Sequence, residues 1–123
     1  MKRLSAREEE IMGFFWEKGP LFVREIVEFY KEPRLHFNTV STFVRGLESQ
    51  GLLGHRSLGT SYQYYPLVTR EEYGKSTVRG AISKYFNNSY LSVVSSLVKE
   101  EDISLDELKE LIRQVEEGNK KRR

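Results

Sequence analysis

A polar helix face near the middle of the chain carries the side chains best suited to chemistry. Residues 36–53 read HFNTVSTFVRGLESQGLL, and helical spacing divides them into two opposite faces. The apolar face carries Val40, Phe43, Val44 and Leu47, and the opposite face carries Asn38, Thr42, Arg45 and Ser49. Asparagine and arginine can read base edges with two hydrogen bonds, and threonine and serine can bond bases or phosphates. This face therefore predicts a helix that lies in the major groove of duplex DNA.

Residues around this face are further candidate DNA contacts. Arg24 lies early in the preceding predicted helix, which would cross the sugar-phosphate backbone. The other candidates lie on the same helix and in the hairpin predicted after it: Thr39, Ser41, Arg56, Thr60 and Ser61. We expect Arg45 to make the strongest contact, because it is the cation on the outward face.

Each of the main candidates also has a purely structural interpretation. Asn38 is equally suited to capping the N-terminus of the helix, since asparagine is a favoured N-cap residue. Arg45 could instead pair with Glu48, and Arg24 with Glu28, because both pairs have helical spacing. Exposed pairs of this kind contribute little stability, so DNA contact is the favoured role for Arg45.

The composition of the chain argues against catalytic chemistry. There is no cysteine, and therefore no disulfide, no thiolate metal site and no cysteine nucleophile. The two histidines, His36 and His55, are too few and too separated to form a metal site. No nucleophile elbow, metal-binding helix or phosphate loop is present. We expect no enzyme activity, metal or cofactor, and, because no apolar run reaches the roughly 18 residues of a membrane span, a cytoplasmic protein.

Charge is distributed unevenly along the chain, although the net charge is only +2. Residues 33–70 contain four arginines and one acid, whereas residues 71–119 contain ten acids and six bases. The basic excess of the folded part thus coincides with the polar helix face. Such a distribution is expected where a phosphate backbone approaches a protein.

Capping signals and apolar spacing place the helices that hold these residues. A serine or threonine precedes a glutamate by three residues at Ser5–Glu8, Thr69–Glu72 and Ser104–Glu107, which is the capping-box pattern. Gly19 ends the first helix, and Gly51 suits a left-handed C-cap of the third. The predicted helices cover about residues 5–18, 23–30, 38–50, 70–86, 90–99 and 104–117.

The segment between the third and fourth predicted helices changes to strand-like alternation. Side chains alternate from Tyr62 to Tyr65, after a turn that contains Gly59. The pattern predicts a hairpin with strands near residues 52–56 and 62–67. We call this hairpin the wing, and we expect its tyrosines to pack between it and the helices. Three helices followed by a hairpin are typical of a winged helix-turn-helix domain.

The sequence is therefore mostly α-helical with a small β-hairpin. We expect a winged-helix DNA-binding domain over residues 1–68, a helical dimerisation region over 69–118 and a disordered basic tail over 119–123. The last two helices have apolar stripes formed by Leu91, Val94, Leu97 and Val98 and by Leu108, Leu111, Ile112 and Val115. Burial of these stripes against a second copy is favoured over their packing against the winged domain.

Three stretches of the chain resemble the penicillinase-repressor (BlaI/MecI) family of bacterial winged-helix regulators. EEEIMGFFWEKGPLFVREIVE resembles the opening of that family, and NTVSTFVRGLESQGLL with YQYYPLVTREEY resembles its recognition helix and the exit from its wing. LVKEEDISLDELKELI resembles its dimerising helices, so that the resemblance covers about residues 4–115. It implies a homodimer that binds a palindromic operator on double-stranded DNA, upstream of resistance or stress genes, and blocks transcription.

The resemblance also implies how such a repressor is switched off. In the family, a membrane-bound, antibiotic-sensing metalloprotease triggers a cut at an Asn-Phe bond just before a Val-Glu-Lys-Glu-like run. The matching run here is Val98–Glu101, so the matching bond joins Ser96 to Leu97, and the Asn-Phe pair is absent. Copper-responsive relatives carry C-terminal cysteines, which this chain lacks.

A different class of function is also compatible with the pattern. A winged-helix domain can serve as a protein–protein adaptor that has no affinity for DNA. In that case a change of charge on the face formed by Asn38, Thr42, Arg45 and Ser49 would not affect function. The two hypotheses differ in what a charge reversal at Arg45 does to operator affinity.

Overall fold

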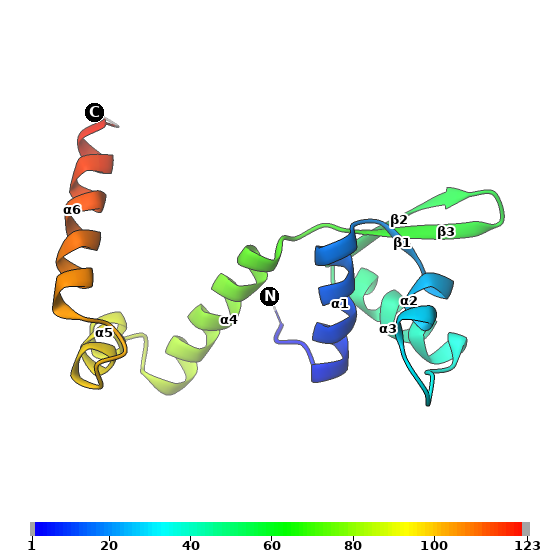
Figure 1. The fold of residues 1–123 in the computed structure, drawn as a ribbon, viewed down its shortest axis with the longest axis horizontal. Coiled ribbons are helices and arrows are strands. Elements are labelled where there is room, and N and C mark those ends of the chain that lie inside the picture. Colours follow the sequence, from blue (N-terminus) through cyan, green and yellow to red (C-terminus); the bar gives the residue numbers. More distant parts are fainter. Residues whose placement is uncertain (1, 122–123) are drawn as a thin grey trace. The chain divides into compact units, whose positions relative to one another are not determined.

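The computed structural model describes residues 2–121 of the chain, and the side chains of residues 2–119 (Figure 1). The elements are α1 Ala6–Lys18, β1 Leu21–Phe22, α2 Val23–Phe29, α3 Phe37–Ser49, β2 Leu53–Leu58, β3 Ser61–Pro66, α4 Arg70–Tyr85, α5 Tyr90–Lys99 and α6 Leu105–Lys121. Contacts within the chain divide it into two compact units, residues 1–78 and 79–123.

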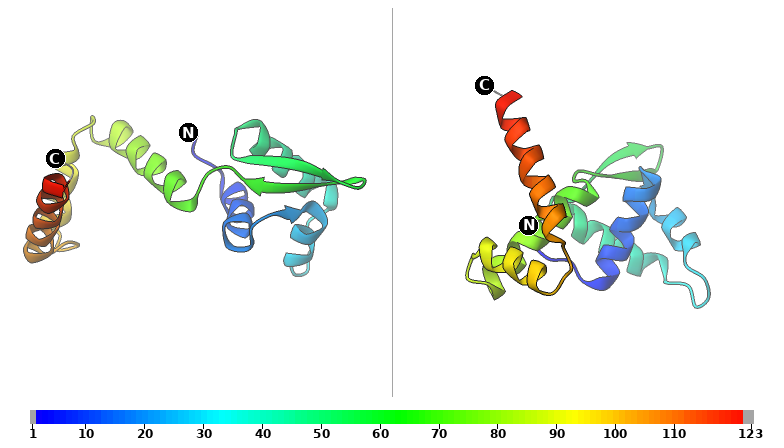
Figure 2. Two further views of the ribbon diagram at one scale, coloured as in Figure 1. Left: turned by 90° about the horizontal axis from the view of Figure 1, so that it is seen from above. Right: turned by 60° about the vertical axis from the view of Figure 1, so that its left-hand side comes forward.

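The first unit combines three helices with a small antiparallel sheet, which is the winged helix-turn-helix arrangement (Figures 1 and 2). The strand order is β1-β3-β2, with Tyr64 of β3 opposite both Leu21 of β1 and His55 of β2. The predicted hairpin is confirmed, although β2 continues to Leu58 and β3 begins at Ser61. The two residues of β1 were not predicted as a strand, because so short a segment shows no alternation.

An apolar core joins the three helices to the sheet. Its fully buried side chains come from each of these helices, from the first residue of β2 and from the residue before it: Ile11, Met12, Phe15, Ile26, Val40, Val44, Leu47, Leu52 and Leu53. Phe14, Val27 and Tyr30 are half-buried at the edge of the core. There Phe14 packs edge-on against the Tyr30 ring at 5.6 Å. Each fully buried apolar side chain of this size contributes roughly 1.5–3 kcal/mol to folding.

The helix ends follow the capping signals of the sequence. Ser5 Oγ accepts the N–H of Glu8, and the Glu8 carboxylate accepts the N–H of Ser5 at 2.9 Å, so the predicted capping box is complete. Gly19 and Gly51, just after α1 and α3, have φ of 84° and 83°, a left-handed conformation that only glycine adopts without strain. At Thr69 the structure shows the hydroxyl accepting the N–H of Glu72.

The first turns of α4 belong to the winged unit. Tyr73 is buried, its hydroxyl accepts the N–H of Leu4 at 3.0 Å, and its ring lies 5.7 Å from the Trp16 ring. The indole of Trp16 in turn donates to the carbonyl oxygen of Val68 at 2.9 Å. Because of these contacts the first compact unit extends to residue 78, beyond the boundary at residue 68 that the sequence suggests.

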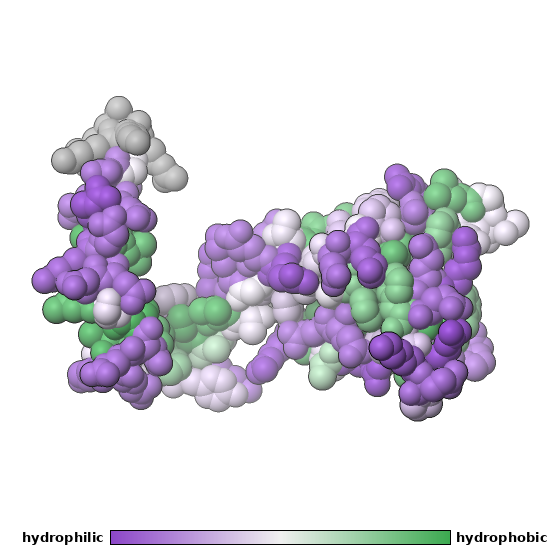
Figure 3. Space-filling model, in the orientation of Figure 1, coloured by the Kyte–Doolittle hydropathy of each residue, from purple (hydrophilic) through white to green (hydrophobic). Residues whose placement is uncertain are grey.

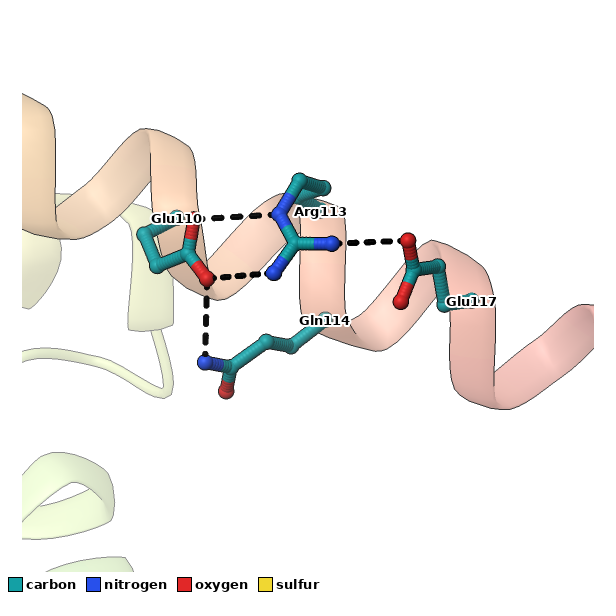
Figure 4. Close-up of polar contacts among 4 residues, drawn as sticks. All are labelled: Glu110, Arg113, Gln114 and Glu117. Carbon is teal, nitrogen blue, oxygen red and sulfur yellow. Dashed lines mark hydrogen bonds and ion pairs between the residues drawn. The ribbon is translucent and has the colours of Figure 1, made fainter.

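In the second unit, α6 separates a polar face from an apolar one. Arg113 bridges Glu110 and Glu117, one turn before and after it, and Gln114 also donates to Glu110 (Figure 4). The Arg113 guanidinium lowers the pKa of the Glu110 carboxyl, and the two carboxylates raise the pKa of Arg113. A complete capping box at Ser104 begins the helix, as predicted. Polar and apolar surface alternate along α5 and α6 in Figure 3.

The end of α6 differs from the prediction for the C-terminus. The helix continues to Lys121, so residues 119–121, which were expected to begin a disordered tail, are helical. An uninterrupted run of residues without proline allows the helix to extend past its apolar stripe. The rest of the expected tail, residues 122–123, lies outside the described residues.

Two arrangements with functional meaning are missing from the part of the chain that the structure describes. No helix within residues 2–121 combines the length and apolar content that crossing a lipid bilayer requires. The same residues bring no three histidine, aspartate or glutamate side chains into a group that could hold a metal ion.

Candidate nucleic-acid interface

The outward face of α3 is open to solvent along its whole length. Its four polar side chains are all exposed: Asn38, Thr42, Arg45 and Ser49. On the opposite side Val40, Val44 and Leu47 are fully buried, and Phe43 is half-buried against the core. The predicted division of this helix into a buried and an exposed face is therefore confirmed. The core fixes the rotation of the helix about its axis, and this rotation aims the polar face outward.

The N-terminus of α3 is capped by His36, a residue to which the sequence assigned no role. His36 Nδ1 accepts the N–H of Asn38 at 3.1 Å. The Asn38 side chain is therefore not the cap, which corrects that alternative. The Thr42 hydroxyl donates to the carbonyl oxygen of Asn38 at 2.9 Å, so its lone pairs stay available as acceptors. Thr39 is exposed in the first turn, beside Asn38.

Arg45 is exposed, and the expected alternative partner Glu48 is engaged elsewhere. The Glu48 carboxylate is hydrogen-bonded to His55 Nδ1 on β2. Within the described residues Arg45 forms no ion pair. Burial raises the pKa of the Tyr64 hydroxyl, the Glu48 carboxylate adds to this rise, and Arg45 opposes it. A cation that no carboxylate neutralises is available to an external anion.

The wing presents a second cation, which is held in place across the hairpin. Arg56 on β2 lies opposite Gln63 on β3, and Gln63 Oε1 accepts two hydrogen bonds from its guanidinium, at 2.9 and 2.6 Å. The contact restrains the side chain without neutralising its charge, since glutamine is uncharged. Thr60 is exposed and Ser61 is half-exposed at the turn of the hairpin, where Gly59 has φ of 64°.

Arg24 lies at the start of α2, over an aromatic ring. Its guanidinium carbon is 4.3 Å from the centre of the Phe22 ring. Glu28, the alternative partner one turn along, pairs instead with Arg34 at 3.3 Å. As for Arg45, the expected intrahelical pair does not form. Stacking on an aromatic face orients the guanidinium but leaves its charge uncompensated.

A hollow of about 380 Å³ lies between the start of α2, the start of α3 and the wing. It brings together four candidates from three separate parts of the sequence: Arg24, Ser41, Thr60 and Ser61. Its remaining lining is apolar or aromatic and was not assigned to the site from the sequence: Phe22, Val23, Phe37, Tyr62 and Tyr64. The other candidates, Asn38, Thr39, Thr42, Arg45 and Arg56, do not line it. One signal was present in the sequence, because Phe37 is an aromatic residue outside the apolar stripe of α3.

The apolar stripes of α5 and α6 are largely open to solvent in the single chain. Five of the eight residues expected to mediate dimerisation are exposed: Leu91, Val94, Leu111, Ile112 and Val115. The other three, Leu97, Val98 and Leu108, are half-buried. Leu91 is the most open of them, with 83% of its surface exposed. Exposed apolar stripes at helical spacing are typical of helices that pack against a partner.

The bond between Ser96 and Leu97 lies inside α5. The Ser96 carbonyl accepts the N–H of Glu100 at 3.0 Å, and the Leu97 carbonyl accepts the N–H of Asp102 at 2.9 Å. Both side chains are half-buried. The bond named as a cleavage site from the resemblance is therefore part of a helix, and the carbonyl groups of both residues are hydrogen-bonded.

Comparison with known proteins decides the family. The family model described as penicillinase repressor matches residues 4–117. The chain belongs to the penicillinase repressor family. It is 28% identical over 109 residues to the methicillin resistance regulatory protein MecI of Mammaliicoccus sciuri, covering 88% of this chain and 89% of that protein. It is 22% identical over 122 residues to the penicillinase repressor of Bacillus licheniformis, covering 98% of this chain and 95% of that protein.

Penicillinase repressors are transcriptional regulators, so this member of the family is a regulator and not an enzyme. Among solved structures, a MarR family transcriptional regulator from Clostridium acetobutylicum matches with a TM-score of 0.41 and 21% sequence identity. That match covers 96% of this chain and 78% of the other.

Proposed function

We propose that this penicillinase repressor family member is a sequence-specific DNA-binding repressor that acts as a homodimer on a palindromic operator. The observation that carries the proposal is the exposed face of α3, on which Arg45 is left uncompensated because Glu48 is bonded to His55. A helix with buried Val40, Val44 and Leu47 can enter the major groove only by this face.

The cations around the face support contact with a phosphate backbone. Arg24, Arg45 and Arg56 belong to α2, α3 and β2, and the structure gives none of them a carboxylate partner among the described residues. Arginine forms paired hydrogen bonds with phosphate or with a guanine edge. Asn38, Thr39, Ser41 and Thr42 supply uncharged groups at the start of α3, and Thr60 and Ser61 supply them at the turn of the wing. We infer that these residues together form the DNA contact.

The exposed stripes of α5 and α6 support dimerisation. Removing the apolar side chains of Leu91, Leu111 and Ile112 from water gives a favourable free energy of about 25 cal/mol per Å². A second copy of the same helices offers a matching apolar surface, and a two-fold axis would match a palindromic site.

The names of the relatives suggest the class of genes. A methicillin resistance regulatory protein and a penicillinase repressor are similar to this chain, so we infer control of antibiotic-resistance or stress genes. A regulator of this kind acts in the cytoplasm, where the DNA is. If a membrane-bound sensor protease inactivates it, the cut at Ser96-Leu97 requires α5 to unwind first, because proteases bind their substrates in extended form.

The proposal is tested by selecting bound sequences from a random duplex pool and measuring affinity for the selected duplex. A palindromic consensus is expected. The Arg45→Glu variant should bind the selected duplex about tenfold to hundredfold more weakly than the wild type. Arg79→Glu is the matched control, because it makes the same charge change at an exposed position of α4. If no sequence is enriched, or if Arg45→Glu binds as well as the control, the adaptor function replaces the repressor.

A further inference from the structure

Phe37, the first residue of α3, exposes an aromatic ring beside the polar outward face of the helix. Of its surface, 49% is open to solvent. The ring is not an isolated apolar residue, because it lines the hollow beside α3 together with Phe22 and Tyr62. Tyr62 is 53% exposed and packs its ring against that of His55 at 4.5 Å. Grouped exposed aromatic side chains mark a binding surface more reliably than single ones.

The position of Phe37 relates it to the residues that face the major groove. Ser41 follows it by one helical turn and lines the same hollow, and Arg45 follows Ser41 by another turn. The three side chains therefore form a single row along the edge of the outward face. A group that fills the hollow beside Phe37 and Ser41 therefore lies at the N-terminal end of the row that continues to Arg45.

The major groove of DNA offers one kind of apolar group to such a ring. Thymine carries a C5-methyl group beside its O4 acceptor at its major-groove edge, whereas the other three bases carry no methyl group there. The phosphate backbone offers no methyl group, and the minor groove does not display this one. An exposed phenylalanine beside the outward face of α3 thus matches thymine better than the other three bases.

We propose that Phe37 is a specificity-determining residue that packs on the C5-methyl group of a thymine in each half-site. The proposal rests on the repressor function proposed above and adds a base to it. Ser41, beside Phe37 in the hollow, supplies a hydroxyl to the same base pair or its neighbour. Burial of one methyl group corresponds to roughly a fourfold change in affinity.

The test is a cycle that combines a protein variant with a modified DNA. The duplex selected from the random pool is synthesised with deoxyuridine in place of one symmetric pair of thymidines at a time, which removes only the methyl groups. At one such pair, wild-type protein should lose roughly fourfold per half-site. The Phe37→Ala variant should bind the thymine and uracil forms equally at that pair, and Phe37→Leu should keep most of the preference.

Leu58→Ala is the matched control, since Leu58 is an exposed apolar residue of the wing, 46% open to solvent. It should retain the thymine preference of the wild type at every position. The proposal is overturned if the ratio of affinities for the thymine and uracil duplexes is the same for Phe37→Ala as for the wild type at every position, even where Phe37→Ala binds both duplexes more weakly. Binding of no duplex by the wild type contradicts the repressor function itself, a separate result.

Discussion

The carboxylate of Glu48 is hydrogen-bonded to Nδ1 of His55, which joins the last turns of α3 to the first strand of the wing. Glu48 lies three residues after Arg45 and would otherwise be within reach of its guanidinium. The bond to His55 thus has two effects. It fixes the wing beside the recognition helix, and it keeps an acid away from the main cation of the outward face.

A His55→Ala variant should therefore bind the selected duplex about twofold more weakly, because released Glu48 can pair with Arg45 at helical spacing. Adding Glu48→Gln to His55→Ala should restore the affinity, since glutamine does not neutralise the arginine. Fluorescence anisotropy at fixed salt measures both effects. If the double variant binds no better than His55→Ala, competition by Glu48 is not the cause of the loss.

Stability at acid pH should depend on the capping box of α1. Hydrogen bonds from Ser5, above all from its backbone N–H, lower the pKa of Glu8 against the opposing effect of burial. A carboxyl whose pKa is lower in the folded state stabilises the fold above its ordinary pKa of about 4.5, and this contribution is lost as the pH falls through the lowered value. Glu8→Gln should weaken this dependence when Tm is measured between pH 7 and acid pH, whereas exposed Glu9→Gln should not.

The other half of the same capping box is tested at neutral pH. Ser5→Ala removes the hydroxyl that accepts the N–H of Glu8 and should lower the free energy of unfolding by about 1 kcal/mol. Ser5→Asp, which retains an acceptor at the N-cap, should cost less. Equal losses in the two variants, measured by denaturant unfolding, would argue against capping as the cause.

Arg24 is expected to contact phosphate rather than a base, because it begins the helix that crosses the DNA backbone and lies outside α3. Arg24→Gln should weaken binding of the selected duplex and of a scrambled duplex by a similar factor. It should also reduce the slope of log affinity against log salt by about 1. Arg7→Gln, on α1, is the control and should leave the slope unchanged. A change in sequence preference with an unchanged slope would assign Arg24 to a base instead.

The dimer prediction is tested on α6. Leu111→Asp places a charge in the exposed apolar stripe and should convert a dimer into a monomer in sedimentation velocity, with a large loss of operator affinity. Lys109→Asp changes the charge of the same helix at an exposed position outside the apolar stripe and should leave the dimer intact. A wild type that sediments as a monomer at all concentrations would contradict the proposed homodimer.

Local patterns in the sequence were sufficient to predict the helices and their faces. The stripe of Val40, Val44 and Leu47 and the capping boxes at Ser5 and Ser104 depend on residues three or four positions apart. Such spacings act within about one helical turn, so they determine where a helix begins and which of its faces is apolar before any tertiary contact forms. For the same reason the exposed candidates on α3 could be named from the sequence.

Tertiary structure decided which partner each side chain takes. The sequence offers Glu48 to Arg45 and Glu28 to Arg24, but folding brings His55 to Glu48 and places Arg34 beside Glu28. Similarly, β1 exists only because Leu21 meets Tyr64 from a distant part of the chain, and α4 begins in the winged unit because Tyr73 reaches Leu4. Contacts between residues far apart in sequence leave no periodic signal, so only the packed chain selects among partners that spacing alone makes equally available.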